Sequence, residues 1–225
     1  MYADIAQARV RLQDWPGAAA AAKTAIDMGG DTPYALSTYS QALEAQKLLP
    51  EAKEVMSRAV SREPKNARYR YRLGRIALQL NDRQTAMQEF QRTIELDPQF
   101  VEAPLSLASI QIDEDLIPEA KETLASVEGS PAAPTGILNN VKAKLALAEG
   151  DLVNAQTLAE AALHEQRDAQ NLSLCIRVAI ARGDARSLSV GQASAQVKLW
   201  AKELDALGEL GSILDLSRRS PKYFD

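Results

Sequence analysis

Apolar and polar residues follow a helical period along most of the chain, most clearly between residues 67 and 100. From Tyr69 to Leu80, apolar residues recur every three or four positions, which places them on one face of a helix. Beyond Asn81, Asp82 is suited to cap a new helix, and Pro98 prevents that helix from continuing. The segment 67–100 is therefore predicted to form two short helices joined by a tight turn.

Gly74 lies inside the apolar face of the first predicted helix. A glycine in the middle of a helix costs about 1 kcal/mol relative to alanine, so its presence indicates that another helix crosses close to it. The second helix of the segment carries the apolar stripe Ala86, Phe90 and Ile94. We expect Gly74 and Ala86 to mark the closest contact between the two helices.

The pattern of residues 67–100 recurs along the chain. A shift of 34 positions brings Ala52 under Ala86 and Pro64 under Pro98, and the segment 48–54 returns almost unchanged as 116–122. Such a period is typical of stacked helical repeats, in which each unit packs only on its neighbours. We predict about six helix-turn-helix units in one array, with a capping helix and tail at 201–225; the units are 1–32, 33–66, 67–100, 101–134, 135–168 and 169–200.

Five residues of the third unit stand at characteristic intervals, namely Leu73, Gly74, Ala86, Phe90 and Pro98. This spacing resembles the signature of the tetratricopeptide repeat family, although an arginine stands where that family usually has tryptophan. The resemblance implies an all-α fold, a right-handed α-solenoid. It also implies that the first helices of the units line a concave groove, where a peptide or helix of another protein binds.

Composition agrees with an all-α chain and offers little chemistry for catalysis. His164 is the single histidine and Cys175 the single cysteine, and no glycine-rich phosphate loop occurs. We therefore expect a non-catalytic protein that binds no cofactor and no metal. We expect His164 on a helix surface and Cys175 in the core.

The net charge of −4 and a pI near 5.3 give no general attraction to nucleic acid or to anionic membranes. No signal peptide and no membrane-spanning run is recognisable. However, the first helix begins almost without a cap, which suggests a chain cut from a longer protein with a signal or further repeats upstream. Cytoplasm and bacterial periplasm both stay open.

The candidate binding surface is the face of the third unit's first helix that the apolar core leaves free. Arginine guanidinium groups bind carboxylates with two hydrogen bonds, and tyrosine adds flat apolar area, so this face fits an acidic peptide. A merely solvated basic surface is the alternative. The third-unit residues are Arg68, Tyr71, Arg72, Arg75, Leu78 and Gln79. The neighbouring candidates are Tyr34, Thr38, Gln41, Leu105, Ser109, Ile112, Asn140 and Lys144.

Three functions remain open at this point. The first is a protein-binding adaptor, within an assembly such as a bacterial secretion or export system, with no nucleic-acid partner and no membrane insertion. The second is RNA binding by a pentatricopeptide-like array, which the acidity of the chain disfavours. The third is a self-assembling scaffold, in which leucines of the C-terminal helix form a dimer contact; these are Leu199, Leu204, Leu207, Leu210 and Leu214.

Overall fold

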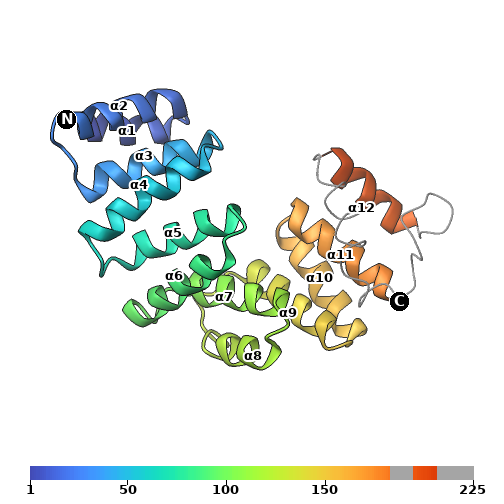
Figure 1. Cartoon of the computed structure of the whole chain (residues 1–225). Coiled ribbons are helices and arrows are strands. Elements are labelled where there is room, and N and C mark those ends of the chain that lie inside the picture. Colours follow the sequence, from blue (N-terminus) through green and yellow to red (C-terminus); the bar gives the residue numbers. More distant parts are fainter. Residues whose placement is uncertain (183–194, 207–225) are drawn as a thin grey trace. The chain divides into compact units, whose positions relative to one another are not determined.

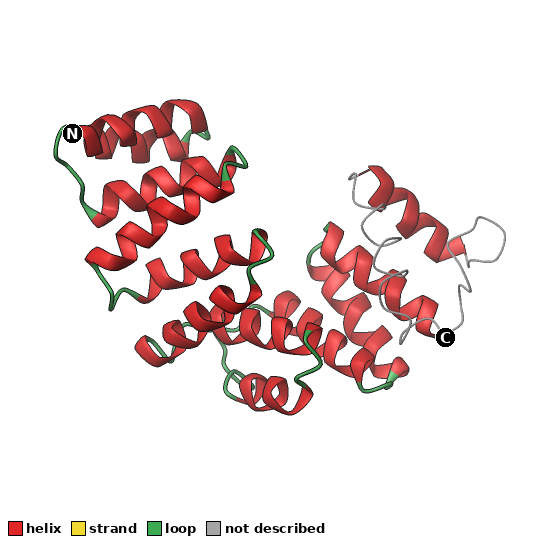
Figure 2. Ribbon diagram, viewed as in Figure 1, coloured by secondary structure: helices red, strands yellow, loops and turns green. Residues whose placement is uncertain are grey.

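The computed structural model describes residues 1–182 and 195–206, and within these ranges every regular element is an α-helix (Figures 1 and 2). This confirms the all-α fold class. By its internal contacts the chain divides into an N-terminal block, Met1–Ile110, and a C-terminal block, Gln111–Asp225. The boundary between the two blocks falls inside helix α7 (Glu102–Asp113). The single continuous array inferred from the repeat period stays a prediction.

The N-terminal block consists of helix pairs that follow one another along the chain. Within each pair the two helices pack against each other, and the second helix also packs on the first helix of the next pair. The first helices α1 and α3 lie side by side. The pairs are α1 (Tyr2–Arg11) with α2 (Trp15–Asp27), α3 (Pro33–Ala45) with α4 (Leu49–Arg62), and α5 (Ala67–Gln79) with α6 (Arg83–Leu96), followed by α7 (Glu102–Asp113).

The C-terminal block continues with α8 (Ile117–Ala125), α9 (Thr135–Ala148), α10 (Leu152–Glu165), α11 (Ala169–Ala181) and α12 (Ala195–Ala206). Helix α10 packs against both α9 and α11, and α12 packs against α11. Helix α8 is short and makes few contacts with α9. None of the helices in the described ranges is long and apolar enough to cross a membrane.

Helix α12 corrects part of the C-terminal prediction. The expected boundary between repeat and capping helix at 200/201 lies inside this one helix. Trp200 is buried and Leu204 is fully buried in the core formed with α9, α10 and α11, so Leu204 is not available for a dimer contact. Leu199 is exposed. The leucines at 207, 210 and 214 lie outside the described residues.

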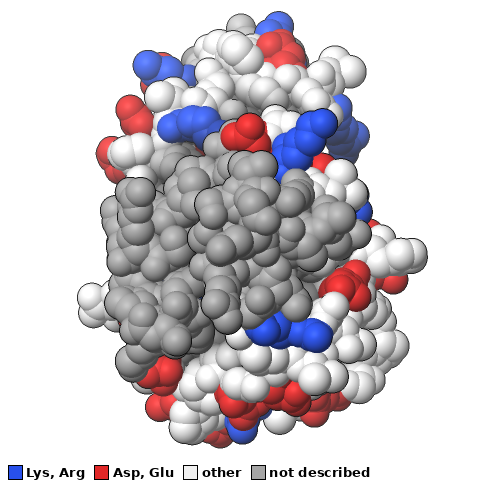
Figure 3. Space-filling view, turned by 90° about the vertical axis from the view of Figure 1, so that its right-hand side faces the viewer, with Lys and Arg blue, Asp and Glu red and all other residues white. Residues whose placement is uncertain are grey.

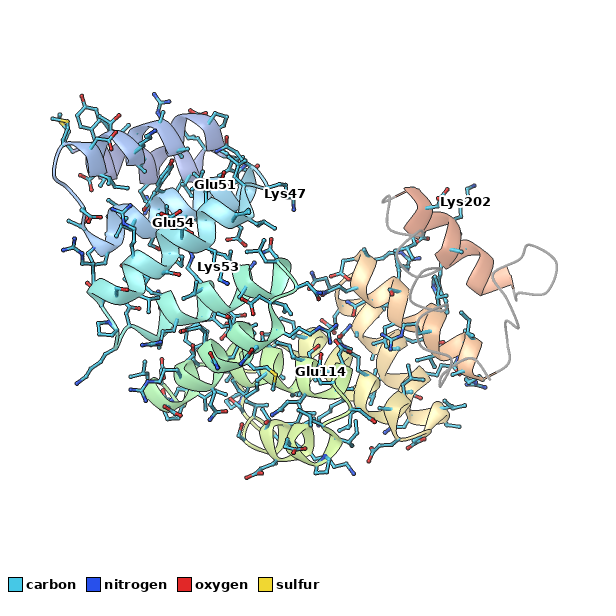
Figure 4. All side chains as sticks on the ribbon, in the orientation of Figure 1. Lys47, Glu51, Lys53, Glu54, Glu114 and Lys202 are labelled. Carbon is cyan, nitrogen blue, oxygen red and sulfur yellow. The ribbon has the colours of Figure 1, made fainter. Side chains whose placement is uncertain are left out.

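The turns inside the helix pairs share one backbone geometry. In each, a residue with φ between +58° and +79° follows the first helix, and the next residue donates its N–H to a carbonyl five positions earlier. This closure ends a helix and reverses the chain. Lys47, labelled in Figure 4, occupies this position between α3 and α4. The five residues stand 34 or 35 positions apart and are Gln13, Lys47, Asn81, Asp115 and Gly150.

Gly150 provides a test of this turn. A side chain in the left-handed region costs roughly 1 to 2 kcal/mol, and a Cβ at Gly150 would meet no other atom within 4 Å. Gly150→Ala should therefore lower the free energy of unfolding by about 1 kcal/mol through backbone strain alone. Lys47→Gly is the matched control and should leave stability equal or higher, because it relieves the same strain. Urea denaturation measures both, and equal stability of wild type and Gly150→Ala would contradict the assigned conformation.

Asp82 joins the third pair to the second. Its carboxylate caps α6 by accepting hydrogen bonds from the Thr85 N–H at 3.1 Å and hydroxyl at 2.7 Å. Lys53 Nζ on α4 donates to the same carboxylate at 2.6 Å. The hydrogen bond from Lys53, followed by those from Thr85, lowers the pKa of Asp82 from 3.8 to about 2. Because the folded-state pKa is lowered, the stabilisation is complete above pH 3.8 and is lost as the pH falls towards 2.

We expect Asp82→Asn to destabilise the protein at neutral pH and to have little effect near pH 2. Asparagine still caps the helix, so the change removes mainly the charged contact with Lys53. Urea midpoints of wild type and variant at pH 7, 4 and 2.5 measure the difference, which should shrink on acidification. Asp151→Asn is the control, since Asp151 caps α10 with no ion-pair partner among the described residues. A difference that grows as the pH falls would refute this role of Asp82.

The core between α5 and α6 is built around Phe90. Its side chain is fully buried, and a Cβ placed on Gly74 would lie 2.7 Å from its ring. The predicted close approach at Gly74 is thus confirmed, with Phe90 as the nearest neighbour. Ala86 is also fully buried in this cluster, together with Ala77 and Leu107. Small residues on one helix therefore make room for the large ring on the other.

Candidate partner-binding surface

The α5 stripe, defined as Arg68, Tyr71, Arg72, Arg75, Leu78 and Gln79, lies on the helix face away from the most deeply buried residues of α5. Helix α5 begins at the cap Asn66, whose side chain accepts a hydrogen bond from Tyr69 N. Leu73, Ile76 and Ala77 are buried in the core. The stripe was predicted to lie on the face that the apolar core leaves free. Four of its six members nevertheless contact other residues of the protein.

Arg72 is the most enclosed cation of the α5 stripe. Its Nη1 donates to Ser37 Oγ on α3 at 2.7 Å. Burial lowers the pKa of Arg72, while the negative charge of Glu44 opposes this shift. Arg72 is therefore a half-buried guanidinium whose close partner is a neutral hydroxyl. Several of its N–H donors are not used by Ser37, since a guanidinium carries five.

Arg75 and Gln79 share one acceptor on α3. Glu44 Oε1 accepts a hydrogen bond from Gln79 Nε2 at 2.7 Å and lies 3.4 Å from Arg75 Nη2. The Glu44 side chain is only 19% exposed, whereas that of Arg75 is 52% exposed. Glu44 thus partly neutralises the stripe from the neighbouring helix.

Tyr71 contributes to packing rather than presenting a free aromatic surface. Its half-buried ring lies 4.8 Å from that of Phe100 and 5.5 Å from that of Phe90, measured between ring centroids, in tilted arrangements. Such contacts stabilise the fold by about 0.5 to 1.5 kcal/mol beyond area burial. Arg68, in contrast, is exposed and has no hydrogen-bond or ion-pair partner among the described residues. Leu78 is 39% exposed.

The three candidates on α3 differ in accessibility. Tyr34 is 45% exposed and Gln41 is half-buried. Thr38 is only 2% exposed, and its hydroxyl lies 2.9 Å from the carbonyl oxygen of Tyr34 and 3.3 Å from Gln7 Oε1 on α1. The prediction that Thr38 faces a ligand is therefore corrected, because its hydroxyl is used inside the protein.

The remaining candidates lie on α7 and in the C-terminal block, and they differ in exposure and in their contacts. Leu105 is 1% exposed and Ile112 is 5% exposed, so both are corrected to core residues. Ser109 is half-buried on α7. In the C-terminal block, Asn140 Nδ2 donates to Asn171 Oδ1 at 2.6 Å. Lys144 Nζ lies 2.8 Å from Asp113 Oδ2, and its side chain is 13% exposed.

These polar contacts repeat along the first helices. Each joins one first helix to the next, and the two partners are 31 or 35 positions apart in the sequence. Ser37 and Glu44 are the contact residues that the sequence-based prediction missed. An offset close to the repeat period could have indicated them. The candidates that remain accessible on the N-terminal block are called the first-helix surface and are Tyr34, Gln41, Arg68, Arg75, Leu78 and Gln79.

Neither a metal-ligand cluster nor a reactive thiol occurs among the described residues. Within residues 1–182 and 195–206 no cluster of three or more metal-ligating side chains occurs. Burial raises the pKa of Cys175 to about 12, so its thiol stays protonated at neutral pH, in agreement with the predicted core position. His164 is exposed on α10. Exposed arginine, tyrosine and leucine side chains are instead typical of binding surfaces.

A family model and several solved structures resemble this chain, and both point to the same helical-repeat fold. The family model described as "Tetratricopeptide repeat" matches residues 3–60 and 41–99. None of the curated proteins compared with the chain matches it. Among solved structures, PilW, a "widely conserved type IV pilus biogenesis factor", is 19% identical with a TM-score of 0.69, over 95% of this chain and 96% of PilW.

Two further structures are similar. A tetratricopeptide repeat protein from Parabacteroides merdae is 14% identical with a TM-score of 0.71, over 99% of this chain and 91% of that one. YrrB, described as having "an unusual peptide-binding site", is 19% identical with a TM-score of 0.61, over 76% of this chain and 88% of YrrB. The family match covers residues 3–99, and the likeness to these solved structures shows that the chain has the fold of tetratricopeptide repeat proteins.

Proposed function

We propose that the chain is a non-catalytic protein-interaction scaffold that binds a peptide or helix of another protein on the first-helix surface of its N-terminal block. The observation that carries this proposal is the environment of Arg72. This half-buried cation has a neutral hydroxyl as its close partner, and an exposed arginine, Arg68, stands one turn before it. A carboxylate placed between them would gain charge-assisted hydrogen bonds in a partly desolvated site.

Apolar and aromatic neighbours extend the surface beyond the two arginines. Tyr34 and Leu78 are large side chains, and 45% and 39% of their surfaces are exposed. Exposed residues of this kind next to arginine are typical of the residues that dominate protein interfaces. The ligand that this combination favours is a peptide or helix that carries an acidic side chain together with an apolar one.

The relatives support a scaffold role in a larger assembly. PilW is described as a pilus biogenesis factor and YrrB as having a peptide-binding site. By analogy, this chain would hold a partner within a multi-protein assembly such as a bacterial secretion or export system. Because both relatives are less than 20% identical to this chain, the analogy extends to the role of a scaffold and not to the identity of the bound partner.

RNA binding is the less favoured function. On the face drawn in Figure 3, described lysine and arginine side chains are interspersed with aspartate and glutamate. A nucleic-acid surface typically gathers its basic residues into one patch, whereas Glu44 of α3 contacts the α5 stripe directly. The net charge of −4 also disfavours binding to nucleic acid.

Affinity capture tests the proposal. Wild type and a variant carrying Arg68→Glu and Arg72→Gln serve as baits, with and without ribonuclease. We expect at least one protein that wild type retains, that the variant loses, and that ribonuclease does not release. Retention that depends on RNA would support the alternative array. Light scattering over a concentration series measures the molar mass of the protein. If this mass rises with concentration and the captured protein is a second copy of the chain, the self-assembling scaffold is favoured.

A further inference from the structure

Glu44 is the acidic residue that faces the α5 stripe from the neighbouring helix α3. Its Oε1 accepts the hydrogen bond from Gln79 Nε2 at 2.7 Å and lies 3.4 Å from Arg75 Nη2. With 19% of its side chain exposed, Glu44 is held between the two helices rather than extended into solvent. Its carboxylate therefore takes the place that a ligand carboxylate would need to pair with Arg75.

The other end of the stripe is arranged differently. Arg72 contacts the neutral Ser37 hydroxyl, and Arg68 has no hydrogen-bond or ion-pair partner within the described part of the chain. Glu44 thus makes its direct contacts with Arg75 and Gln79 and acts on Arg72 only through its charge. The N–H groups of Arg68, and those of Arg72 that Ser37 does not use, are left for a ligand. The same negative charge would repel a second ligand carboxylate placed beside Arg75.

We propose that Glu44 is a built-in competitor that determines specificity: it occupies Arg75 and confines the acidic group of a partner to Arg68 and Arg72. This inference rests on the proposed function, since it assumes that the first-helix surface binds a partner. Its consequence is that the three arginines accept a single acidic group next to an apolar residue. They do not bind a continuous acidic run along the stripe.

The test uses a fluorescent, acetylated hexaglutamate peptide and anisotropy at low salt with the full chain. Glu44→Gln should bind this peptide about tenfold more tightly than wild type, a change of about 1.4 kcal/mol, because competition and repulsion are both removed. The glutamine amide oxygen can still accept the hydrogen bond from Gln79, so the variant should keep its fold. Thermal unfolding of the variant verifies this.

Substitutions of Arg75 test whether the gain in peptide affinity of Glu44→Gln arises from release of Arg75. In wild type, Arg75→Gln should weaken binding by no more than about twofold, since Glu44 already engages Arg75. In the Glu44→Gln background, the same change should remove most of the tenfold gain. Arg58→Gln is the matched control. It removes an arginine of α4 that pairs with Asp31, and it should change the affinity of either background by less than about twofold.

The outcomes separate this inference from the proposed function. If Arg75→Gln weakens wild type as much as Arg72→Gln does, or if the tightening by Glu44→Gln persists without Arg75, Glu44 is not a competitor for Arg75. The same holds if Glu44→Gln does not tighten binding, although the scaffold function then stands as long as binding depends on Arg72. Peptide binding that is insensitive to both Arg68 and Arg72 would overturn the proposed function itself, and no binding by any variant, Glu44→Gln included, would overturn the inference about Glu44.

Discussion

Replacing Arg68 by glutamate and Arg72 by glutamine should weaken binding of the captured partner at least about 100-fold. Each charge-assisted hydrogen bond contributes about 1.5 to 3 kcal/mol, so losing two of them and adding repulsion costs at least about 3 kcal/mol. Stability should change less. Arg68 is exposed, and Arg72 loses its charge-assisted bond to Ser37, worth at most about 1.5 to 3 kcal/mol. Titration calorimetry and thermal unfolding give both quantities.

A matched double variant on the other layer of helices controls for charge. Arg58 and Arg62 on α4 both contact Asp31, and Arg58→Glu with Arg62→Gln makes the same net change in charge. This variant should bind the partner within about threefold of wild type, since changes at the rim of or outside an interface contribute little. Equal losses in both double variants would mean that only the overall charge matters and that the first-helix surface is not the site.

Phe90→Ala should lower the free energy of unfolding by about 3 to 5 kcal/mol, more than any of the substitutions at Asp82, Gly74 or Gly150. The ring is fully buried and fills the space beside Gly74, so its removal leaves a cavity between α5 and α6. This is a large part of the roughly 5 to 15 kcal/mol by which domains are typically stable. Urea denaturation monitored by circular dichroism measures the change. Met87→Ala is the control, since Met87 is only partly buried against the same cluster, and it should cost less.

The contact between Gly74 and Phe90 can be tested separately. Gly74→Ala places a Cβ 2.7 Å from the ring and should cost about 1 to 3 kcal/mol through overpacking. With Phe90→Leu in the background, the same change should cost less because the ring edge is gone. Additive effects of the two changes would show that the ring does not lie against Gly74.

The helices of the third pair could be predicted because their signals are local. The apolar period, the cap Asp82 and the turn at Asn81 act over a few residues, and the structure places α5, the turn and α6 accordingly. Gly74 indicated the close helix contact for the same reason, although its nearest neighbour is Phe90 rather than Ala86. Repetition strengthened each of these predictions, since one backbone geometry recurs at the five described turns inside the helix pairs.

The binding surface was harder to predict because its contacts cross from one helix pair to the next. A single helix pattern distinguishes apolar from polar faces, but it does not show which polar side chains meet. Arg72 and Arg75 were therefore assigned to a ligand-facing stripe, and their contacts with Ser37 and Glu44 of α3 were not predicted. The 34-residue period was available, yet it fixes the spacing of backbones rather than the reach of long side chains.

Burial was also underestimated at some positions of the first helices. Thr38 and Leu105 were assigned to a groove by their register in the repeat, yet both are buried. First helices lie beside one another as well as beside their own partners, so more than one of their faces is covered. The sequence-based prediction assumed that each helix buries a single face, so it placed buried residues such as Thr38 and Leu105 on the surface.

Site-specific photocrosslinking tests the central claim most directly. Benzoylphenylalanine replaces Leu78 on α5 or Tyr34 on α3, both exposed on the first-helix surface, and Glu54 on α4, which is exposed on the other layer (Figure 4). With the partner identified by affinity capture, irradiation should give a crosslinked product at positions 78 and 34 and none at 54. A crosslink at position 54 alone would contradict the account, because the partner would then bind the second helices.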